Sequence, residues 1–210
     1  MNITIIGASA GVGLETVKRA LNRKHNVTTL SRSEINLPSN SNLTMLKGSA
    51  TNKTDLINSI EKADAVIVAL GTGKSMKPTT LYSDFAKLLV EVQTESNSQI
   101  PFIILTGFGA GESGQYNGFM MKLFFKFLLK DVYADKTKME EIITTSKMKW
   151  EIVRPGLLKD KELTEDYRVE TNLFKGINIG SINRTDVADF LIKQAENPTN
   201  LFKFSSLSNK

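Results

Sequence analysis

A glycine-rich turn near the N-terminus has the clearest chemical signature in the sequence. The residues Gly7-Ala8-Ser9-Ala10-Gly11-Val12-Gly13 directly follow an apolar segment and open a helix that we expect to begin near Leu14. In such a turn the first glycine permits a tight bend, small residues let the backbone approach a pyrophosphate, and the last glycine allows close helix–strand packing. Backbone N–H groups at the helix N-terminus then face the negative charge. The turn predicts a dinucleotide site, with a tight turn that binds no ligand as the alternative.

The end of the second expected strand indicates which dinucleotide would bind. An NAD-preferring fold carries an acid here, which hydrogen-bonds to the ribose 2′-hydroxyl. This chain instead has Ser31-Arg32-Ser33. A guanidinium fork and hydroxyls suit a 2′-phosphate, whose charge an aspartate would repel. We therefore expect Ser31 and Arg32 to bind NADP(H); an exposed loop arginine without a ligand is the alternative.

Two further turns follow the third and fourth expected strands. Gly48-Ser49-Ala50 stands where an adenine ring would lie, and Leu70-Gly71-Thr72-Gly73 stands beside the adenosine ribose and pyrophosphate. Glycines are common turn residues in any fold, so these positions depend on the first motif for their meaning. With it, Ser49, Ala50 and the four residues from Leu70 to Gly73 are expected cofactor-binding residues.

Strands and helices must position these turns. Along the sequence, apolar segments of strand length alternate with segments of helix length. The expected strands are 2–6, 27–31, 43–47, 65–70, 101–106 and 150–154, and the expected helices are 14–23, 53–62, 80–96, 136–146 and 185–196. Several strands are apolar on nearly every residue, which is typical of parallel strands covered on both faces. The pattern predicts an α/β fold: a single Rossmann-type domain over residues 1–210, with a doubly wound parallel sheet and helices on both faces.

A glycine-rich loop at 107–118 follows the fifth expected strand, at the edge of the sheet where ligands bind in open α/β folds. The next segment, Phe119 to Leu129, is apolar except for Lys122 and Lys126, and Lys130 continues the same four-residue spacing. Three lysines would then share one helix face. The pattern favours a core or pocket-wall helix with its lysines in solvent, and a helix lying on a membrane surface is the alternative.

Composition excludes several classes of function. The net charge of +5 comes from scattered basic residues, whereas nucleic-acid sites gather them, so we expect no nucleic-acid partner. The chain has no cysteine and one histidine, His25, which leaves nothing for thiolate chemistry, a Ser-His-Asp triad or a multi-histidine metal site. We expect no metal, and His25 exposed in a turn. Without a signal peptide or an apolar run of membrane-span length, we expect a cytoplasmic protein with no membrane span.

Three other motifs resemble the atypical short-chain dehydrogenase/reductases with an NmrA-like, NAD(P)H-binding domain. They are Asp64 to Thr72 with Lys77-Pro78-Thr79-Thr80, Met139-Glu140-Glu141 through Trp150 to Gly156, and Ile182-Asn183-Arg184-Thr185-Asp186-Val187-Ala188. Nearly the whole chain is covered, and the likeness is to the family's flavin and biliverdin reductases. The resemblance implies hydride transfer from NADPH to a flavin, quinone or similar ring. It implies that the pyrophosphate contacts Gly7, Ser9, Ala10, Gly11, Val12 and Gly13, the 2′-phosphate contacts Arg32, and Thr106, Pro155, Gly156 and Leu157 border the nicotinamide.

The sequence departs from the family at two positions. The Tyr-x-x-x-Lys pair of typical members is missing, because Tyr133 precedes Lys136 by three positions and Val132 stands where the tyrosine belongs. Gly107 stands where the flavin reductases have a serine beside the nicotinamide, which leaves Thr106 as the nearest hydroxyl. We therefore expect Thr106 and Lys136 to be the catalytic residues. Lys136 would orient the nicotinamide ribose; the alternative is an ordinary charge pair with Asp135 at a helix start.

We predict an NADPH-dependent oxidoreductase acting on a small-molecule ring acceptor. Its substrate pocket would be built from segments 107–135 and 155–180, with Phe108, Tyr116, Phe119 and Tyr167 as candidate walls or core aromatics. Hydride transfer to such rings needs little acid–base chemistry from the protein. The alternative is a non-catalytic NADP sensor, which the missing tyrosine favours; a sugar-nucleotide epimerase would need that tyrosine and a larger C-terminal part. We expect a monomer or a weak homodimer.

Overall fold

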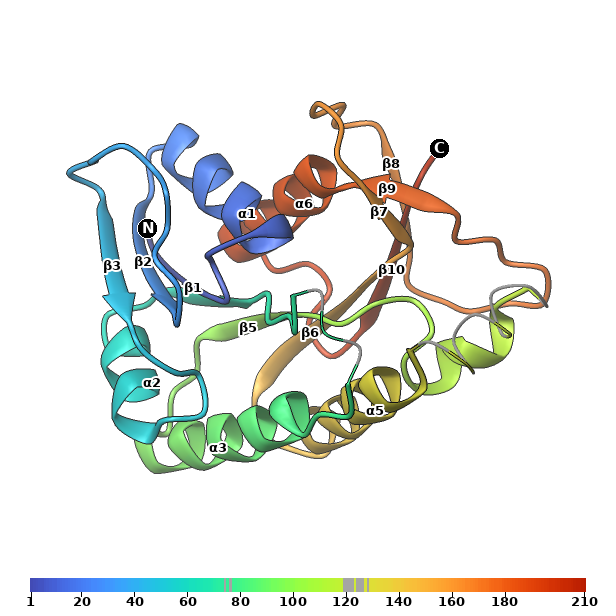
Figure 1. Cartoon of the computed structure of the whole chain (residues 1–210), viewed down its shortest axis with the longest axis horizontal. Helices are drawn as coiled ribbons and strands as arrows, with labels where there is room; N and C mark the ends of the chain where they lie inside the picture. Colours follow the sequence, from blue (N-terminus) through green and yellow to red (C-terminus); the bar gives the residue numbers. More distant parts are fainter. Residues whose placement is uncertain (74, 76, 119–122, 124–126, 128) are drawn as a thin grey trace.

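The computed structural model describes residues 1–73, 75, 77–118, 123, 127 and 129–210. Within that part of the chain, eight strands form one sheet in the order β3-β2-β1-β4-β5-β6-β10-β8 (Figure 1). Neighbouring strands are parallel except β8, which runs antiparallel to β10. The strands are β1 (Asn2–Ile6), β2 (Asn26–Ser31), β3 (Leu43–Lys47), β4 (Ala65–Val68), β5 (Pro101–Leu105), β6 (Lys149–Pro155), β8 (Tyr167–Glu170) and β10 (Phe204–Asn209).

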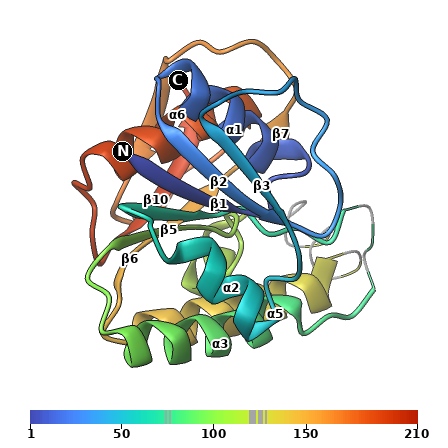
Figure 2. The ribbon, with the colours of Figure 1, turned by 90° about the vertical axis from the view of Figure 1, so that its left-hand side faces the viewer.

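Helices cover both faces of this sheet (Figures 1 and 2). On one face lie α1 (Gly11–Asn22) and α6 (Arg184–Glu196), and on the other lie α2 (Lys53–Ile60), α3 (Leu81–Ser96) and α5 (Lys130–Thr144). Each helix layer buries its own apolar cluster against the sheet. The predicted doubly wound Rossmann-type sheet is therefore confirmed, with an antiparallel edge strand that was not expected.

Local sequence explains where several elements begin. The four residues of β4 are all buried, as expected of a strand covered on both faces. At the start of α2, the Asn52 side chain accepts a hydrogen bond from the N–H of Asp55, which caps the helix. The predicted start of α5 near Lys136 is wrong: the helix begins at Lys130, so Asp135 and Lys136 lie inside it. The charge-pair pattern is equally compatible with a helix interior.

The chain reverses direction across the sheet at β1. From β1 it moves outward to β2 and β3, and then returns to place β4 on the other side of β1. In open α/β sheets, the crevice at the carboxyl ends of the strands on either side of such a reversal is the usual ligand site. The glycine-rich turn follows β1, and the turn from Leu70 to Gly73 follows β4.

Smaller elements lie beyond the carboxyl ends of β5 and β6. They are the short 3-10 helix η1 (Gly111–Tyr116) and a separate parallel pair, β7 (Leu157–Lys159) with β9 (Ser181–Asn183). Most of the predicted helix from Phe119 to Leu129, including Phe119, Lys122 and Lys126, lies outside the described residues. Among the helices that are described, none combines the length and apolar character that a bilayer crossing needs.

Candidate functional site

Two glycines of the turn after β1 are required by close packing. A Cβ atom on Gly7 would lie 2.5 Å from the carbonyl oxygen of Ala69, and Gly7 has a φ of +88°. A Cβ atom on Gly13 would lie 2.1 Å from the carbonyl oxygen of Gly7. Gly7 thus lets the turn pass directly over the end of β4, and Gly13 lets α1 pack onto the turn, as the sequence predicts.

The turn leaves the N-terminus of α1 open to a ligand. Ala10, at the N-cap, has an extended backbone and makes no side-chain cap, and the first turn of α1 has no acidic residue. Gly11 has a φ of +56°, and a Cβ atom there would meet only the Nε of Arg184, at 3.7 Å. Uncapped amides at a helix N-terminus form a favourable site for an anion. The residues present therefore fit the diphosphate of a dinucleotide.

At the carboxyl end of β2, Arg32 is exposed and Ser31 is buried. The Ser31 hydroxyl donates a hydrogen bond to the carbonyl oxygen of Ser33 at 2.7 Å, so it stabilises its own turn. Lys47, which is level with Ser31 on β3, approaches Glu34 only to 3.9 Å. Of the predicted Ser31-Arg32-Ser33 site, the exposed side chains of Arg32 and Ser33 are therefore accessible to a ligand, whereas the Ser31 hydroxyl is buried and engaged.

The turns after β3 and β4 are held by specific contacts. The N–H of Ser49 donates to the Asp55 carboxylate at 2.8 Å, and a Cβ atom on Gly48 would lie 2.6 Å from the same carboxylate. After β4, Tyr82 hydrogen-bonds to Thr72. Gly73 has a φ of +63°, and among the described residues no atom would lie within 4 Å of a Cβ atom there. Both turns lie at the carboxyl edge of the sheet, where the sequence places them.

The predicted catalytic residues meet where the interior of α5 lies beside the carboxyl end of β5. Lys136 Nζ donates to the carbonyl oxygen of Thr106 at 2.7 Å and lies 5.0 Å from the ring centroid of Tyr133. Burial lowers the pKa of Lys136 to about 8 and raises the pKa of Tyr133 to about 12. The Thr106 hydroxyl donates to Glu140 at 2.7 Å. Although the spacing is not Tyr-x-x-x-Lys, a tyrosine and a lysine are therefore side by side.

The sequence model of the NAD(P)H-binding family matches residues 7–198. The chain belongs to the NAD(P)H-binding family. The matched region spans the glycine-rich turn, the residues around Thr106 and Lys136, and the start of α6. Family membership confirms the resemblance expected from the motifs.

Several solved structures have the same fold as this chain. A protein of Streptococcus pneumoniae TIGR4, proposed to be an NADH-flavin reductase, has 23% sequence identity and a TM-score of 0.80, with 100% of each chain covered. ChuY, an anaerobilin reductase of Escherichia coli O157:H7, has 20% identity and a TM-score of 0.78, covering 100% of this chain and 97% of its own. A short-chain dehydrogenase/reductase of Veillonella parvula, in complex with NADP, has 17% identity and a TM-score of 0.83, covering 99% and 94%. At these identities the likeness establishes the fold.

Behind Thr106 lies a buried ion cluster that sequence reasoning did not identify. Arg154 is fully buried; it pairs with Glu140 at 2.6 Å and with Glu112 at 2.8 Å. A Cβ atom on Gly111 would lie 2.6 Å from the Glu140 carboxylate and 2.7 Å from the guanidinium. The cluster joins η1, α5 and β6 beneath the loop that follows β5. The available signal was Arg154 itself, which directly follows the apolar pair Ile152 and Val153 in an expected strand, because charged residues are rarely buried without partners.

Other predicted residues have structural surroundings that the sequence left open. Asp135 is buried and accepts hydrogen bonds from the N–H of Tyr82 at 2.8 Å and the hydroxyl of Ser83 at 2.5 Å, so it anchors the start of α3. The prediction that His25 is exposed is wrong. It lies before β2 as expected, but it is 8% exposed and pairs with Glu196 of α6 at 2.7 Å, because α6 covers this turn. In the described residues no group of acidic or histidine side chains could hold a metal.

The expected nicotinamide border lies at the end of β6. The N–H of Phe108 donates to the carbonyl oxygen of Pro155 at 2.9 Å, which ties the loop after β5 to β6. A Cβ atom on Gly156 would lie 2.4 Å from the carbonyl oxygen of Gly180, so the chain needs a glycine there. Leu157 is exposed. These residues and Thr106 therefore share one region at the carboxyl edge of the sheet.

Proposed function

We propose that the protein is an NADPH-dependent oxidoreductase that reduces a flavin, quinone or similar ring. The observation that carries the proposal is the packing of the turn after β1, in a chain of the NAD(P)H-binding family. Gly7 and Gly13 are required by sterics, and Gly11 leaves the uncapped α1 N-terminus accessible. These features are what a diphosphate site needs, and a turn without a ligand would not need the accessible helix end.

In this proposal, residues at the carboxyl ends of different strands bind different parts of the cofactor. The amides from Ser9 to Gly13 bind the diphosphate, and Arg32 binds the 2′-phosphate. Ser49 and Ala50 border the adenine, and the turn from Leu70 to Gly73 borders the adenosine ribose. Thr106 with residues 155–157 holds the nicotinamide ring, and the cofactor supplies the hydride when bound.

The acceptor pocket is proposed between segments 107–135 and 155–180. A pocket of about 290 Å³ is lined by residues of both segments, Gln115 and Tyr116 from one and Lys175 and Gly176 from the other. Lys136 is proposed to position the nicotinamide ribose, since its Nζ is already fixed on the Thr106 carbonyl. The reaction needs proximity and a water-poor slot more than it needs a strong acid.

The test of cofactor preference is the affinity of an Arg32→Ala variant for NADPH and NADH. Charge-assisted hydrogen bonds contribute about 1.5–3 kcal/mol, so we expect NADPH to bind at least about tenfold more weakly and NADH to be almost unaffected. The control is Lys62→Ala, which also removes one positive charge. Lys62 precedes β4, at the amino ends of the strands, whereas Arg32 follows β2, at the carboxyl ends. Equal losses for both nucleotides in Arg32→Ala would contradict the NADP assignment.

A non-catalytic NADP sensor is the second candidate, and the hydrogen bonding around Thr106 favours it. The Thr106 hydroxyl donates to Glu140, so the hydroxyl expected nearest the nicotinamide already has an internal partner. Steady-state NADPH oxidation with FMN, menadione and biliverdin distinguishes the candidates. Turnover with any of these acceptors supports the reductase, whereas tight NADPH binding without turnover across the panel supports the sensor.

A further inference from the structure

The start of α6 fastens the segment that follows β7. The buried Asp186 accepts hydrogen bonds from the N–H of Thr164 at 2.8 Å and the N–H of Glu165 at 2.9 Å. The Thr185 hydroxyl donates to the carbonyl oxygen of Lys161 at 2.9 Å. Residues 161–165 are thereby held against α6. These bonds explain Thr185 and Asp186 of the motif at the start of α6, whereas the side chain of Arg184 takes no part in them.

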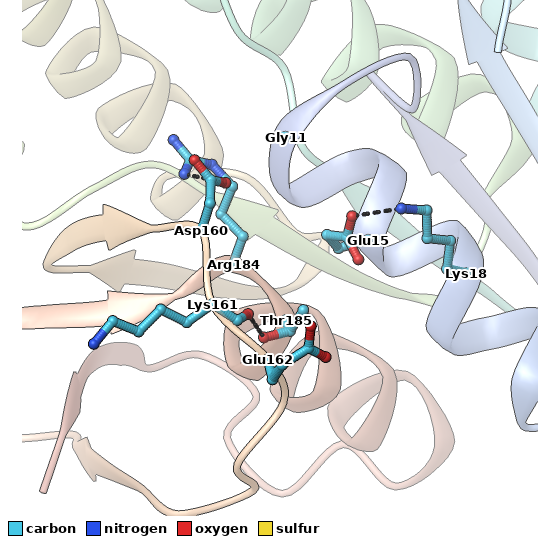
Figure 3. Close-up of a pocket in the computed structure, with 8 residues that line it drawn as sticks. All are labelled: Gly11, Glu15, Lys18, Asp160, Lys161, Glu162, Arg184 and Thr185. Atoms are coloured by element: carbon cyan, nitrogen blue, oxygen red, sulfur yellow. Dashed lines mark hydrogen bonds and ion pairs between the residues drawn. The ribbon is translucent and has the colours of Figure 1, made fainter. Parts of the chain in front are cut away.

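Arg184 faces the glycine-rich turn. Its Nε lies 3.7 Å from the position of a Cβ on Gly11, and the two residues line one pocket of about 480 Å³. Figure 3 shows the guanidinium beside Asp160, on the side of the pocket toward the N-terminus of α1. The pocket is lined by Gly11, Glu15, Lys18, Asp160, Lys161, Glu162, Arg184 and Thr185. An anion held by the α1 amides would therefore have a guanidinium on its other side.

The charges around Arg184 leave it able to exchange partners. Asp160, its ion-pair partner at 2.7 Å, is 87% exposed. An ion pair this exposed contributes little net free energy, because both groups are well solvated when apart. Glu15 is paired with Lys18 at 2.8 Å, and Lys161 extends away from the turn (Figure 3). A doubly charged diphosphate would thus compete well with Asp160 for the guanidinium.

We propose that Arg184 binds the diphosphate of the dinucleotide, opposite the amides of α1, and releases Asp160 when it does so. The planar fork of arginine suits the paired oxygens of a phosphate. The inference rests on the proposed function for the presence of the dinucleotide. It adds a side-chain ligand to a site otherwise built from backbone, and it gives the motif at the start of α6 a role in positioning that ligand.

The test compares three ligands by isothermal titration calorimetry in wild type and Arg184→Ala. NADPH and ADP contain a diphosphate, and adenosine 2′-monophosphate does not. We expect Arg184→Ala to weaken NADPH and ADP by about tenfold to a hundredfold and to leave adenosine 2′-monophosphate within about twofold, since only the diphosphate contact is lost. Lys161→Ala, which removes the same charge from the same pocket, is the matched control and should leave all three affinities within about twofold.

Two further variants keep the outcome interpretable. Asp160→Asn removes the competitor while keeping the side chain's shape, and should tighten NADPH binding several-fold. Arg184→Lys should recover part of the lost affinity, and thermal melting monitors the folding of every variant.

If wild type binds NADPH and Arg184→Ala binds it equally well, the inference is wrong and the proposed function stands. A loss that extends equally to adenosine 2′-monophosphate also overturns it. If wild type binds no NADPH, the proposed function itself fails.

Discussion

The glycines of the turn after β1 differ in what they contribute. Gly13 is constrained by space alone: its absent side chain lets α1 lie against the carbonyl of Gly7, 2.1 Å from where a Cβ would be. We expect Gly13→Ala to lower the free energy of unfolding by about 2 kcal/mol or more, because backbone must move on both sides. Urea denaturation measures this. Gly180→Ala, at a site with no atom within 4 Å of the Cβ, should stay within about 0.5 kcal/mol of wild type. Similar losses of unfolding free energy in Gly13→Ala and Gly180→Ala would contradict the conclusion that close packing requires a glycine at position 13.

Lys136 makes stability depend on pH in the alkaline range. Burial lowers its pKa from 10.5 to about 8 in the folded protein, so between these values the unfolded chain binds more protons and stability rises with pH. We expect wild type to gain about 2 kcal/mol relative to Lys136→Met between pH 7.5 and 9.5, measured by urea denaturation at each pH. That window ends before Tyr133, whose pKa is raised to about 12, contributes in the opposite direction. A constant difference between the two proteins would argue against a buried Lys136.

The residues of the turn were predictable from sequence, whereas their partners were not. Type and spacing are enough to recognise Gly7 and Gly13, because a close backbone approach leaves room for no other residue. Lys136 was predicted at a helix start and the contact with the Thr106 carbonyl was not foreseen, because that contact joins residues 30 positions apart. Pairing across such distances depends on how the elements pack.

At the scale of elements, the Arg154 cluster holds η1 against α5 and β6. Arg154→Met would leave Glu140, whose side chain is 4% exposed, charged and unpaired, at a cost of about 3–5 kcal/mol. Glu112→Gln removes the half-exposed partner and should cost less than about 1 kcal/mol, while increasing amide exchange in residues 107–118. Urea denaturation and hydrogen exchange measure the two effects. Equal destabilisation by Arg154→Met and Glu112→Gln would show that burial does not determine which of the two ion-pair partners of Arg154 matters more for stability.

Element positions followed from periodicity where the pattern was apolar. The expected strands at 2–6 and 43–47 have the observed bounds, and the expected helices at 80–96 and 185–196 each differ by one residue at their N-terminal ends. The strands β8 and β10 were not predicted. The strand β10 contains Ser205, Ser206 and Ser208 and so lacks the apolar run or alternation that indicates a strand. The strand β8 does alternate, Tyr167 and Val169 with Arg168 and Glu170, but only over four residues. Pairing with β6 defines β10, and pairing with β10 defines β8.

At the scale of the whole molecule, Glu151 lies where the last strand joins the sheet. It is fully buried on β6, accepts a hydrogen bond from Ser205 of β10 at 2.5 Å, and has a pKa raised by burial to about 7. Because the folded protein binds this proton more tightly than the unfolded chain, stability is lost as pH rises from about 4.5 to 7. We expect Glu151→Gln to be more stable than wild type by about 2–3 kcal/mol at pH 8 and nearly equal at pH 4.5. Thermal or urea unfolding at both pH values checks this, and a gain that is independent of pH would contradict it.

The strand order also fixes a sequence of events during biosynthesis. Within the described residues β8 pairs in the sheet with β10 alone, although it precedes β10 in the chain by more than thirty positions. A nascent chain that has released β8 but still holds β10 inside the ribosome can therefore assemble the sheet only as far as β6. Until β10 emerges, the edge of β6 that β10 later covers stays open, and an incomplete molecule could pair there with a neighbour instead of with itself.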